Sequence, residues 1–186
     1  MVGLCGSLRS ASFNGMALRL AGECMPTTMA MQVLDWREVP PFDADTFAQG
    51  VPAVVALLCK RIRKADAVLI ATPEYNFSIP GMLKNTLDWL SRVDDQPFQR
   101  KPVAVLSAAT GPLGGARVQY ELRKVLLFLD ATVLGKPEVF IGHAATKFDA
   151  RGRCTDVLTR DFVSRQMAAF QHWISQSLAV SPGREK

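Results

Sequence analysis

The 186-residue sequence contains few residues of the kinds that mark a metal site, a disulfide framework or a membrane span. It has two histidines, and its four cysteines are widely spaced without a CxxC pair, which predicts buried free thiols and no bound metal. No run of 18 apolar residues occurs, and no basic start is followed by a long apolar segment. We therefore expect no membrane partner and no export, which favours a cytoplasmic protein.

Motifs of several common enzyme classes are also missing. The sequence lacks GxxxxGK[ST], and no GxGxxG follows its first apolar run, which argues against a triphosphate or dinucleotide loop there. No GxSxG occurs, so a hydrolase with a nucleophile elbow is not supported. The net charge is +5, but the basic residues are dispersed among acids, and the cluster at 60–64 ends a predicted helix, where cations complement the helix dipole. We expect no nucleic-acid partner.

Short apolar runs alternate with helical patterns along the chain. Runs of strand length lie at 2–5, 29–34, 67–72, 102–107 and 138–141. Runs that are apolar on both faces and joined by helices predict a doubly wound α/β fold, with a five-stranded parallel sheet and helices on both faces. We expect the flavodoxin-like strand order 2-1-3-4-5 in a single domain over residues 1–180, with a frayed tail over 181–186.

The segment GSLRSASFN, residues 6–14, follows the first apolar run and precedes a helix. Glycine permits a sharp turn, small polar side chains can hydrogen-bond to an anion, and Arg9 adds a permanent positive charge. These features predict a phosphate site that suits a monophosphate better than a triphosphate. The alternative is an ordinary turn with Ser12 or Asn14 as a helix cap, which leaves Arg9 unexplained.

Two further loops are predicted to meet this segment. In the order 2-1-3-4-5, strands 1, 3 and 4 are neighbours, and ligands bind beyond their carboxyl ends. The loop at 73–80 is stiffened by prolines, and its aromatic and amide side chains suit a flat heteroaromatic ring. The alternative is a stiff turn whose Tyr75 and Phe77 pack in the core. The loop at 107–115 is rich in glycine, which allows close approach to the other edge of such a ring.

The segments GSLRSASFN, PEYNFSIPGMLKNTLDWLSR and GPLGGARVQYELRKVLLFLDA together resemble the NAD(P)H-dependent FMN reductase family, which includes quinone, chromate and azo-dye reductases. The resemblance covers about residues 3–149. It implies FMN as the cofactor, bound by residues of all three loops. These residues are Ser7, Arg9, Ser12, Phe13 and Asn14 at the phosphate, Pro73, Glu74, Tyr75, Asn76 and Phe77 along the isoalloxazine, and Ser107 and Gly111 in the facing loop.

The resemblance also implies a reaction. NADPH or NADH delivers hydride to the flavin and leaves, after which a quinone, chromate, an azo compound or free flavin takes the electrons. No catalytic side chain is expected, because the protein positions the cofactor. The alternatives are a flavodoxin-type electron carrier and a non-catalytic FMN-binding module, which an assay of NAD(P)H turnover distinguishes. Assembly in the family implies a homodimer or a homotetramer.

Overall fold

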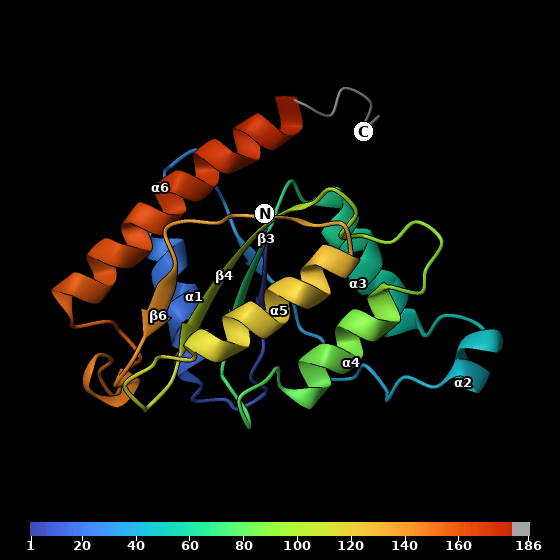
Figure 1. The fold of residues 1–186 in the computed structure, drawn as a ribbon, viewed down its shortest axis with the longest axis horizontal. Helices are drawn as coiled ribbons and strands as arrows, with labels where there is room; N and C mark the ends of the chain where they lie inside the picture. The colour runs from blue at the N-terminus through green and yellow to red at the C-terminus, as the bar shows by residue number, and fades with distance from the viewer. Residues whose placement is uncertain (180–186) are drawn as a thin grey trace.

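The computed structural model describes residues 1–179, so the predicted tail at 181–186 lies outside the described residues. Strands and helices alternate along the chain (Figure 1). In order they are β1 (Val2–Cys5), α1 (Phe13–Cys24), β2 (Gln32–Val33), α2 (Ala44–Ala48), α3 (Ala53–Lys64), β3 (Val68–Thr72), α4 (Gly81–Leu90), β4 (Pro102–Ala108), α5 (Ala116–Phe128), β5 (Thr132–Val133), β6 (Val139–Ile141), a 3-10 turn (Ala144–Thr146) and α6 (Val157–Ala179). Among these helices, none combines the length and apolarity needed to cross a bilayer.

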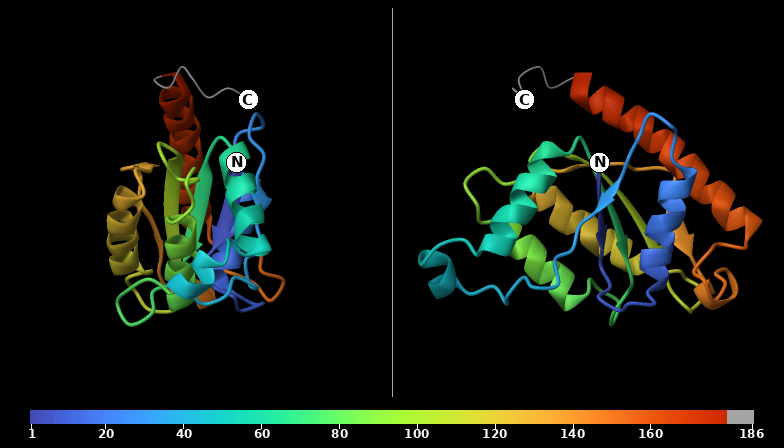
Figure 2. Two further views of the ribbon diagram at one scale, coloured as in Figure 1. Left: turned by 90° about the vertical axis from the view of Figure 1, so that its right-hand side faces the viewer. Right: turned by 180° about the vertical axis from the view of Figure 1, so that it is seen from behind.

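The strands form one parallel sheet in the order β2-β1-β3-β4-β5, which confirms the predicted order. Helices cover both faces of the sheet, as the edge-on view in Figure 2 shows. Alternate side chains of β3 enter two separate cores: Val68 and Ile70 pack with α3, α4 and α5, whereas Leu69 and Ala71 pack with α1 and α6. Burial on both faces explains why this strand is a continuous apolar run.

The fifth position of the sheet is divided between two short strands. β5 pairs with the start of β4, and β6 pairs with its end, so the sheet has six strands rather than the predicted five. Pro137 lies between β5 and β6 and has no N–H to donate to a ladder. Two buried glutamines bridge the interruption from opposite faces: Gln119 of α5 donates to the Val139 carbonyl at 2.8 Å, and Gln166 of α6 donates to the carbonyls of Val105 and Pro137 at 3.0 Å.

Two differences from the predicted elements lie between β1 and β3. The strand predicted at 29–34 is reduced to Gln32–Val33 at the edge of the sheet. Helix α2 was not predicted, because its single turn has no apolar period. Its N-cap is Asp43, whose carboxylate accepts hydrogen bonds from the N–H groups of Asp45 and Thr46.

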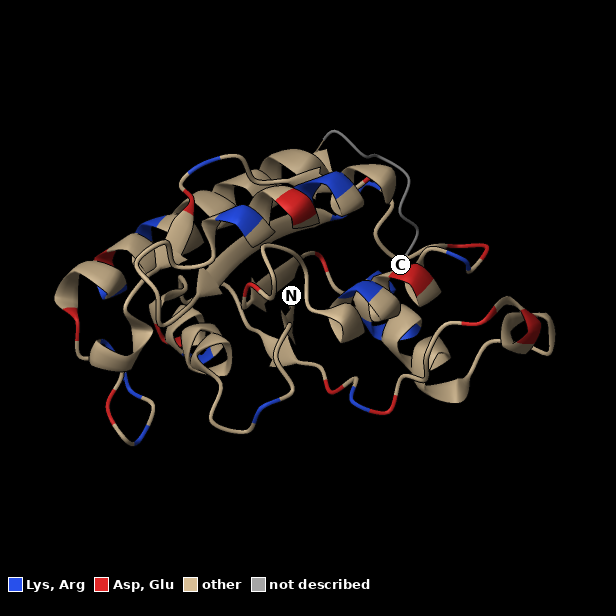
Figure 3. Ribbon diagram, turned by 60° about the horizontal axis from the view of Figure 1, so that its bottom comes forward, with Lys and Arg blue, Asp and Glu red and all other residues tan. Residues whose placement is uncertain are grey.

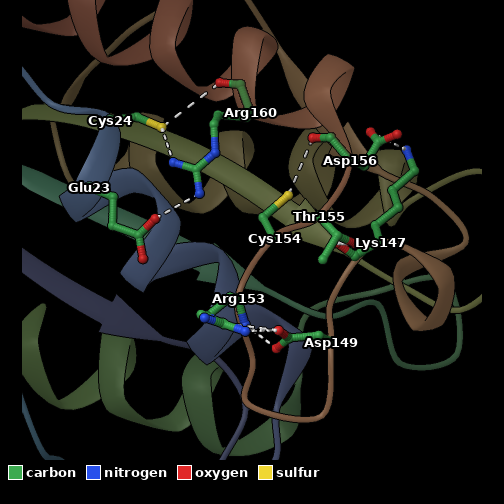
Figure 4. A network of polar contacts seen from close by, with 9 residues as sticks. All are labelled: Glu23, Cys24, Lys147, Asp149, Arg153, Cys154, Thr155, Asp156 and Arg160. Atoms are coloured by element: carbon green, nitrogen blue, oxygen red, sulfur yellow. Dashed lines mark hydrogen bonds and ion pairs between the residues drawn. The ribbon is translucent and has the colours of Figure 1, made fainter.

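Polar contacts join α1 to α6 on the face of the sheet that these two helices cover (Figure 4). Arg160 donates to the Glu23 carboxylate at 2.9 Å and to the Cys24 sulfur at 3.9 Å. Burial raises the pKa of the Cys24 thiol, which favours its neutral form. All four cysteines are free thiols, as predicted, but only Cys59 is fully buried and the other three are half-buried.

Candidate cofactor site

The loops that follow β1, β3 and β4 lie together along the lower edge of the sheet in Figure 1. The end of β1 approaches β3 so closely that residue 6 must be glycine. Its N–H donates to the Ala71 carbonyl at 2.7 Å, and a Cβ at this position would lie 2.5 Å from the Thr72 hydroxyl oxygen. The pairing of β1 with β3 and of β3 with β4 therefore brings the three loops together, as predicted.

The first loop, residues 6–14, contains both a helix cap and a bridge to β4. The Ser12 hydroxyl accepts from the N–H groups of Asn14 at 3.2 Å and Gly15 at 3.4 Å, which caps α1. The Asn14 side chain is buried, donates to the Ala108 carbonyl at 2.9 Å and accepts from the Ala108 N–H at 2.9 Å. The helix-cap alternative is thus correct for Ser12, whereas the Asn14 amide is committed to holding two loops together.

Arg9 is the residue of this loop that the cap does not explain. Its side chain is exposed, and within residues 1–179 no carboxylate pairs with its guanidinium. Its own N–H donates to the Ser7 hydroxyl at 3.4 Å, which places a cation and a hydroxyl on one turn. In Figure 3, which brings this edge forward, Lys and Arg segments are interspersed with Asp and Glu segments. An unpaired cation therefore lies on a face that has no single charge sign.

The second loop ends in a two-residue hairpin turn. Tyr75 and Ser78 exchange hydrogen bonds of 3.0 and 2.9 Å, and the residues between them, Asn76 and Phe77, have φ values of 51° and 66°. Asn tolerates this left-handed conformation, but for Phe it is an outlier that costs about 1–3 kcal/mol. Tyr75 is 52% exposed and Phe77 is 66% exposed, so the core-packing alternative is wrong. The turn presents aromatic rings to solvent at a cost in backbone strain.

Glu74, beside this turn, caps α5 from another part of the chain. Its side chain is only 8% exposed, and its carboxylate accepts from the N–H groups of Arg117 at 3.1 Å and Val118 at 3.3 Å. Helix α5 has no side-chain cap of its own, since Gly115 precedes it. The Glu74 carboxylate is therefore used at the helix N-terminus, where the dipole favours a negative charge. The placement of Glu74 along the isoalloxazine stays a prediction.

Arg117 was not among the site residues predicted from the sequence. Its guanidinium pairs with Glu74 at 2.5 Å and lies 3.8 Å from the centre of the Phe77 ring. One signal was available: an arginine in the first turn of a helix is unfavourable with the helix dipole and so indicates a compensating carboxylate nearby.

Ser107 anchors the third loop, residues 107–115, through a hydrogen bond from its side chain. This buried hydroxyl donates to the Gly114 carbonyl at 2.6 Å and accepts from Gln119 at 2.8 Å, so it supports the loop from inside the protein. Gly114 has a φ of 60°, and a Cβ there would lie 2.7 Å from the Gly142 nitrogen. Gly111 is exposed, with nothing within 4 Å of the position of a Cβ. The exposed part of this loop includes the Gly111 backbone and the Leu113 side chain, which is 54% exposed.

The last of the expected site residues, Phe13, is half-buried. Its ring centre lies 6.2 Å from that of Phe148, in the core beneath α1 and α6. The Phe13 side chain is thus packed inside the protein, as are those of Asn14 and Ser107.

Comparison with known proteins adds a family to this geometry. Residues 1–146 match the family described as NADPH-dependent FMN reductase. The chain belongs to this family. It is 45% identical over 174 residues to an NAD(P)H-dependent FMN reductase of Pseudomonas aeruginosa, with 94% of each chain covered. It is also 45% identical over 179 residues to a quinone reductase of Escherichia coli K12, with 95% of each covered.

A solved structure shows the same fold. It is that of a flavoenzyme NAD(P)H:(acceptor) oxidoreductase from Paracoccus denitrificans, with a TM-score of 0.86, 33% identity, and coverage of 95% of this chain and 97% of that one. Membership in the FMN reductase family confirms the resemblance found in the sequence. It also confirms the prediction of an NAD(P)H-dependent flavin oxidoreductase with FMN as cofactor, in preference to a carrier or a non-catalytic module.

The groups on the three loops fit the cofactor of an FMN reductase. A phosphate monoester requires a cation, hydroxyls and helix N-terminal amides, and the loop at 6–14 brings Arg9 and Ser7 to the start of α1. A planar heteroaromatic ring requires aromatic surface and accessible backbone, which the exposed turn at 75–78 and the open backbone at Gly111 supply.

Proposed function

We propose that this FMN reductase uses NADPH or NADH to reduce a quinone or a similar small acceptor at a crevice formed by the loops after β1, β3 and β4. The quinone is chosen because a relative with 45% identity over nearly its whole length is a quinone reductase. Bound FMN supplies the acceptance of hydride and the release of electrons. The chain contributes binding and orientation, and we assign no catalytic side chain.

The unpaired Arg9 carries the assignment of the phosphate end. An exposed guanidinium without a carboxylate partner, on a loop that leads into a helix N-terminus, favours an anionic ligand. Ser7 adds a hydroxyl beside it. In this assignment Ser12, Phe13 and Asn14 contribute the shape of the first helical turn, since their side chains and the Asn14 N–H are engaged within the protein.

The ring end is assigned to the segment Pro73–Phe77 and to the backbone near Gly111. Support comes from the exposed Tyr75 and Phe77 and from a backbone that tertiary contacts hold in a strained turn. Such strain is typical of binding and active sites. Glu74 and Ser107 would act at the ring through their main chain and through the loops that they hold in place.

Titration of the flavin-free protein with FMN and with riboflavin tests the phosphate assignment. Arg9→Ala is expected to weaken FMN binding by about 1.5–3 kcal/mol, or about tenfold to a hundredfold, while riboflavin affinity is unchanged because riboflavin has no phosphate. Arg37→Ala is the matched control, since Arg37 is an exposed arginine that belongs to none of the three loops and lies 3.9 Å from Asp35. Unchanged FMN affinity in Arg9→Ala would remove the assignment.

Turnover tests the acceptor separately. The flavin-loaded protein is expected to oxidise NADPH or NADH in a quinone-dependent way. Rates with both nucleotides against a quinone, chromate, an azo dye and free FMN rank the acceptors. If no quinone supports NAD(P)H oxidation while FMN binds normally, the assignment of a quinone as acceptor is wrong and the assignment of FMN still stands.

We also propose that the reductase assembles as a homodimer or homotetramer in the cytoplasm. Helix α5 supports assembly, since Leu127 and Phe128 at its end are 77% and 79% exposed, Tyr120 on the same helix is 52% exposed, and Leu113 before its start is 54% exposed. Exposed large apolar side chains of this kind are typical of interaction surfaces. Four free thiols favour a reducing compartment. Light scattering that finds a monomer at micromolar concentration would contradict the assembly.

A further inference from the structure

We propose that Arg117 is a positioning residue that clamps the Tyr75–Ser78 turn against the N-terminus of α5, so that the turn is already shaped when the flavin ring binds. The inference rests on the proposed function, because this turn belongs to the loop assigned to the isoalloxazine. It adds a residue that was not among the predicted site residues.

The charge of Arg117 is already compensated within the protein. Its Nε donates to Glu74 at 2.6 Å and its terminal nitrogen lies 2.5 Å from the same carboxylate oxygen. The other Glu74 oxygen accepts from the main-chain N–H groups of Arg117 and Val118. The carboxylate therefore fixes the base of the loop to α5 and at the same time orients the guanidinium.

The guanidinium in turn covers the tip of the loop. Its central carbon lies 3.8 Å from the centre of the Phe77 ring, well within the range of a cation–π contact. Phe77 is largely exposed and has a φ of 66°, so its conformation requires support from outside the turn. Arg117 supplies such support, since it holds the ring that follows the first left-handed residue, Asn76.

These two anchors restrict both ends of the turn. Glu74 holds the entry, and the Arg117–Phe77 contact holds the tip, so the loop does not have to be ordered by its ligand. Preorganisation of this kind raises affinity by lowering the entropy lost on binding. We expect Arg117 to act on the isoalloxazine end only, in contrast to Arg9.

Limited digestion of the flavin-free protein with chymotrypsin tests the clamp without any activity assay. Cleavage after Tyr75 and Phe77 is expected to be at least about fivefold faster in Arg117→Ala than in wild type, because proteolysis follows the population of the open loop. Lys124→Ala is the matched control, since Lys124 is an exposed cation on the same helix that pairs with Glu121 at 2.7 Å. Arg117→Lys keeps a cation for Glu74 but loses the planar stack, and an intermediate rate is expected.

Flavin titration adds the second measurement. Arg117→Ala is expected to weaken FMN and riboflavin by the same factor, about threefold to tenfold, since the phosphate is not involved. A cleavage rate equal to that of wild type overturns the clamp. So does a loss confined to FMN, or a rise in KM confined to NADPH, because either would make Arg117 a phosphate ligand.

The clamp and the proposed function fail in different ways. If wild-type protein binds neither flavin, the proposed function is lost, while the digestion rates still decide whether Arg117 restrains the turn. If circular dichroism shows that Arg117→Ala is unfolded, Arg117→Lys carries the test, and wild-type rates of digestion and wild-type flavin affinities in that variant overturn the clamp.

Discussion

Arg9 and Arg117 lie at the same edge of the sheet in opposite electrostatic situations. Arg9 is exposed and has no carboxylate partner within residues 1–179, whereas Arg117 shares two contacts with a mostly buried Glu74 and stacks on Phe77. A cation that is compensated internally has little attraction left for a ligand anion, while an uncompensated one retains all of it. On this basis we propose two separate tasks in the site: recognition of charge for Arg9, and maintenance of the shape of a loop for Arg117.

The largest effect is expected when both arginines are removed. Because they act on different ends of the cofactor, the losses in Arg9→Ala and Arg117→Ala should add, giving about 30-fold to 1000-fold weaker FMN binding. FMN dissociation constants of the wild type, both single variants and the double variant form the cycle. A coupling energy above about 1 kcal/mol would show that the two residues serve one function and would end the separation.

The loop that carries Arg9 has its own tertiary anchor, Asn14. Asn14→Ala removes both hydrogen bonds to the Ala108 main chain, and the unpaired buried groups are expected to lower the free energy of unfolding by about 2–3 kcal/mol. Urea denaturation measures the change, and Gln176→Ala on the exposed side of α6 is the control. A loss below about 0.5 kcal/mol would mean that the first loop, unlike the second, holds its shape without a distant anchor.

Ionic strength should affect the two arginines unequally. Between about 0.05 and 0.5 M salt, we expect FMN affinity to fall about twofold to fivefold more than riboflavin affinity, since the Arg9 charge is exposed to screening. The chymotrypsin rate at the clamp should change less over the same range, because Glu74 is mostly buried. Equal salt dependence for the two flavins would contradict a phosphate contact at Arg9.

The smallest effect concerns pH and a group remote from both arginines. Hydrogen bonds from the Thr159 hydroxyl and then from its N–H hold the pKa of Asp156 below its ordinary value. A lowered carboxylate pKa stabilises the fold above the unfolded-state value of about 3.9, and this contribution is lost as pH falls through the folded value. The melting temperature of Asp156→Asn should therefore lie below that of wild type at pH 7, and the difference should shrink as the pH falls below about 3.9. A constant difference would refute the assignment.

Apolar periodicity was sufficient for most of the fold. The run at 67–72 is apolar on both faces because β3 is covered on both, and this burial is a property of each side chain along the strand. The fifth position was read as one strand, because the run at 138–141 is visible while Thr132–Val133 is too short to show a period. The division of this position between β5 and β6 also depends on Gln119 and Gln166, because the carbonyls to which they donate lie on other elements.

Local patterns of apolar, glycine and charged residues were enough to predict the parallel sheet and the edge where the loops meet, and they pointed to Arg9 as the cation of the proposed phosphate site. Tertiary structure alone decided which polar side chains are free. The hydroxyl of Ser107, the amide of Asn14 and the carboxylate of Glu74 all suit a ligand by residue type, yet each is bound within the protein. Glu74 and Arg117 are 43 residues apart, and a hydrogen bond at that separation exists only once the chain has folded.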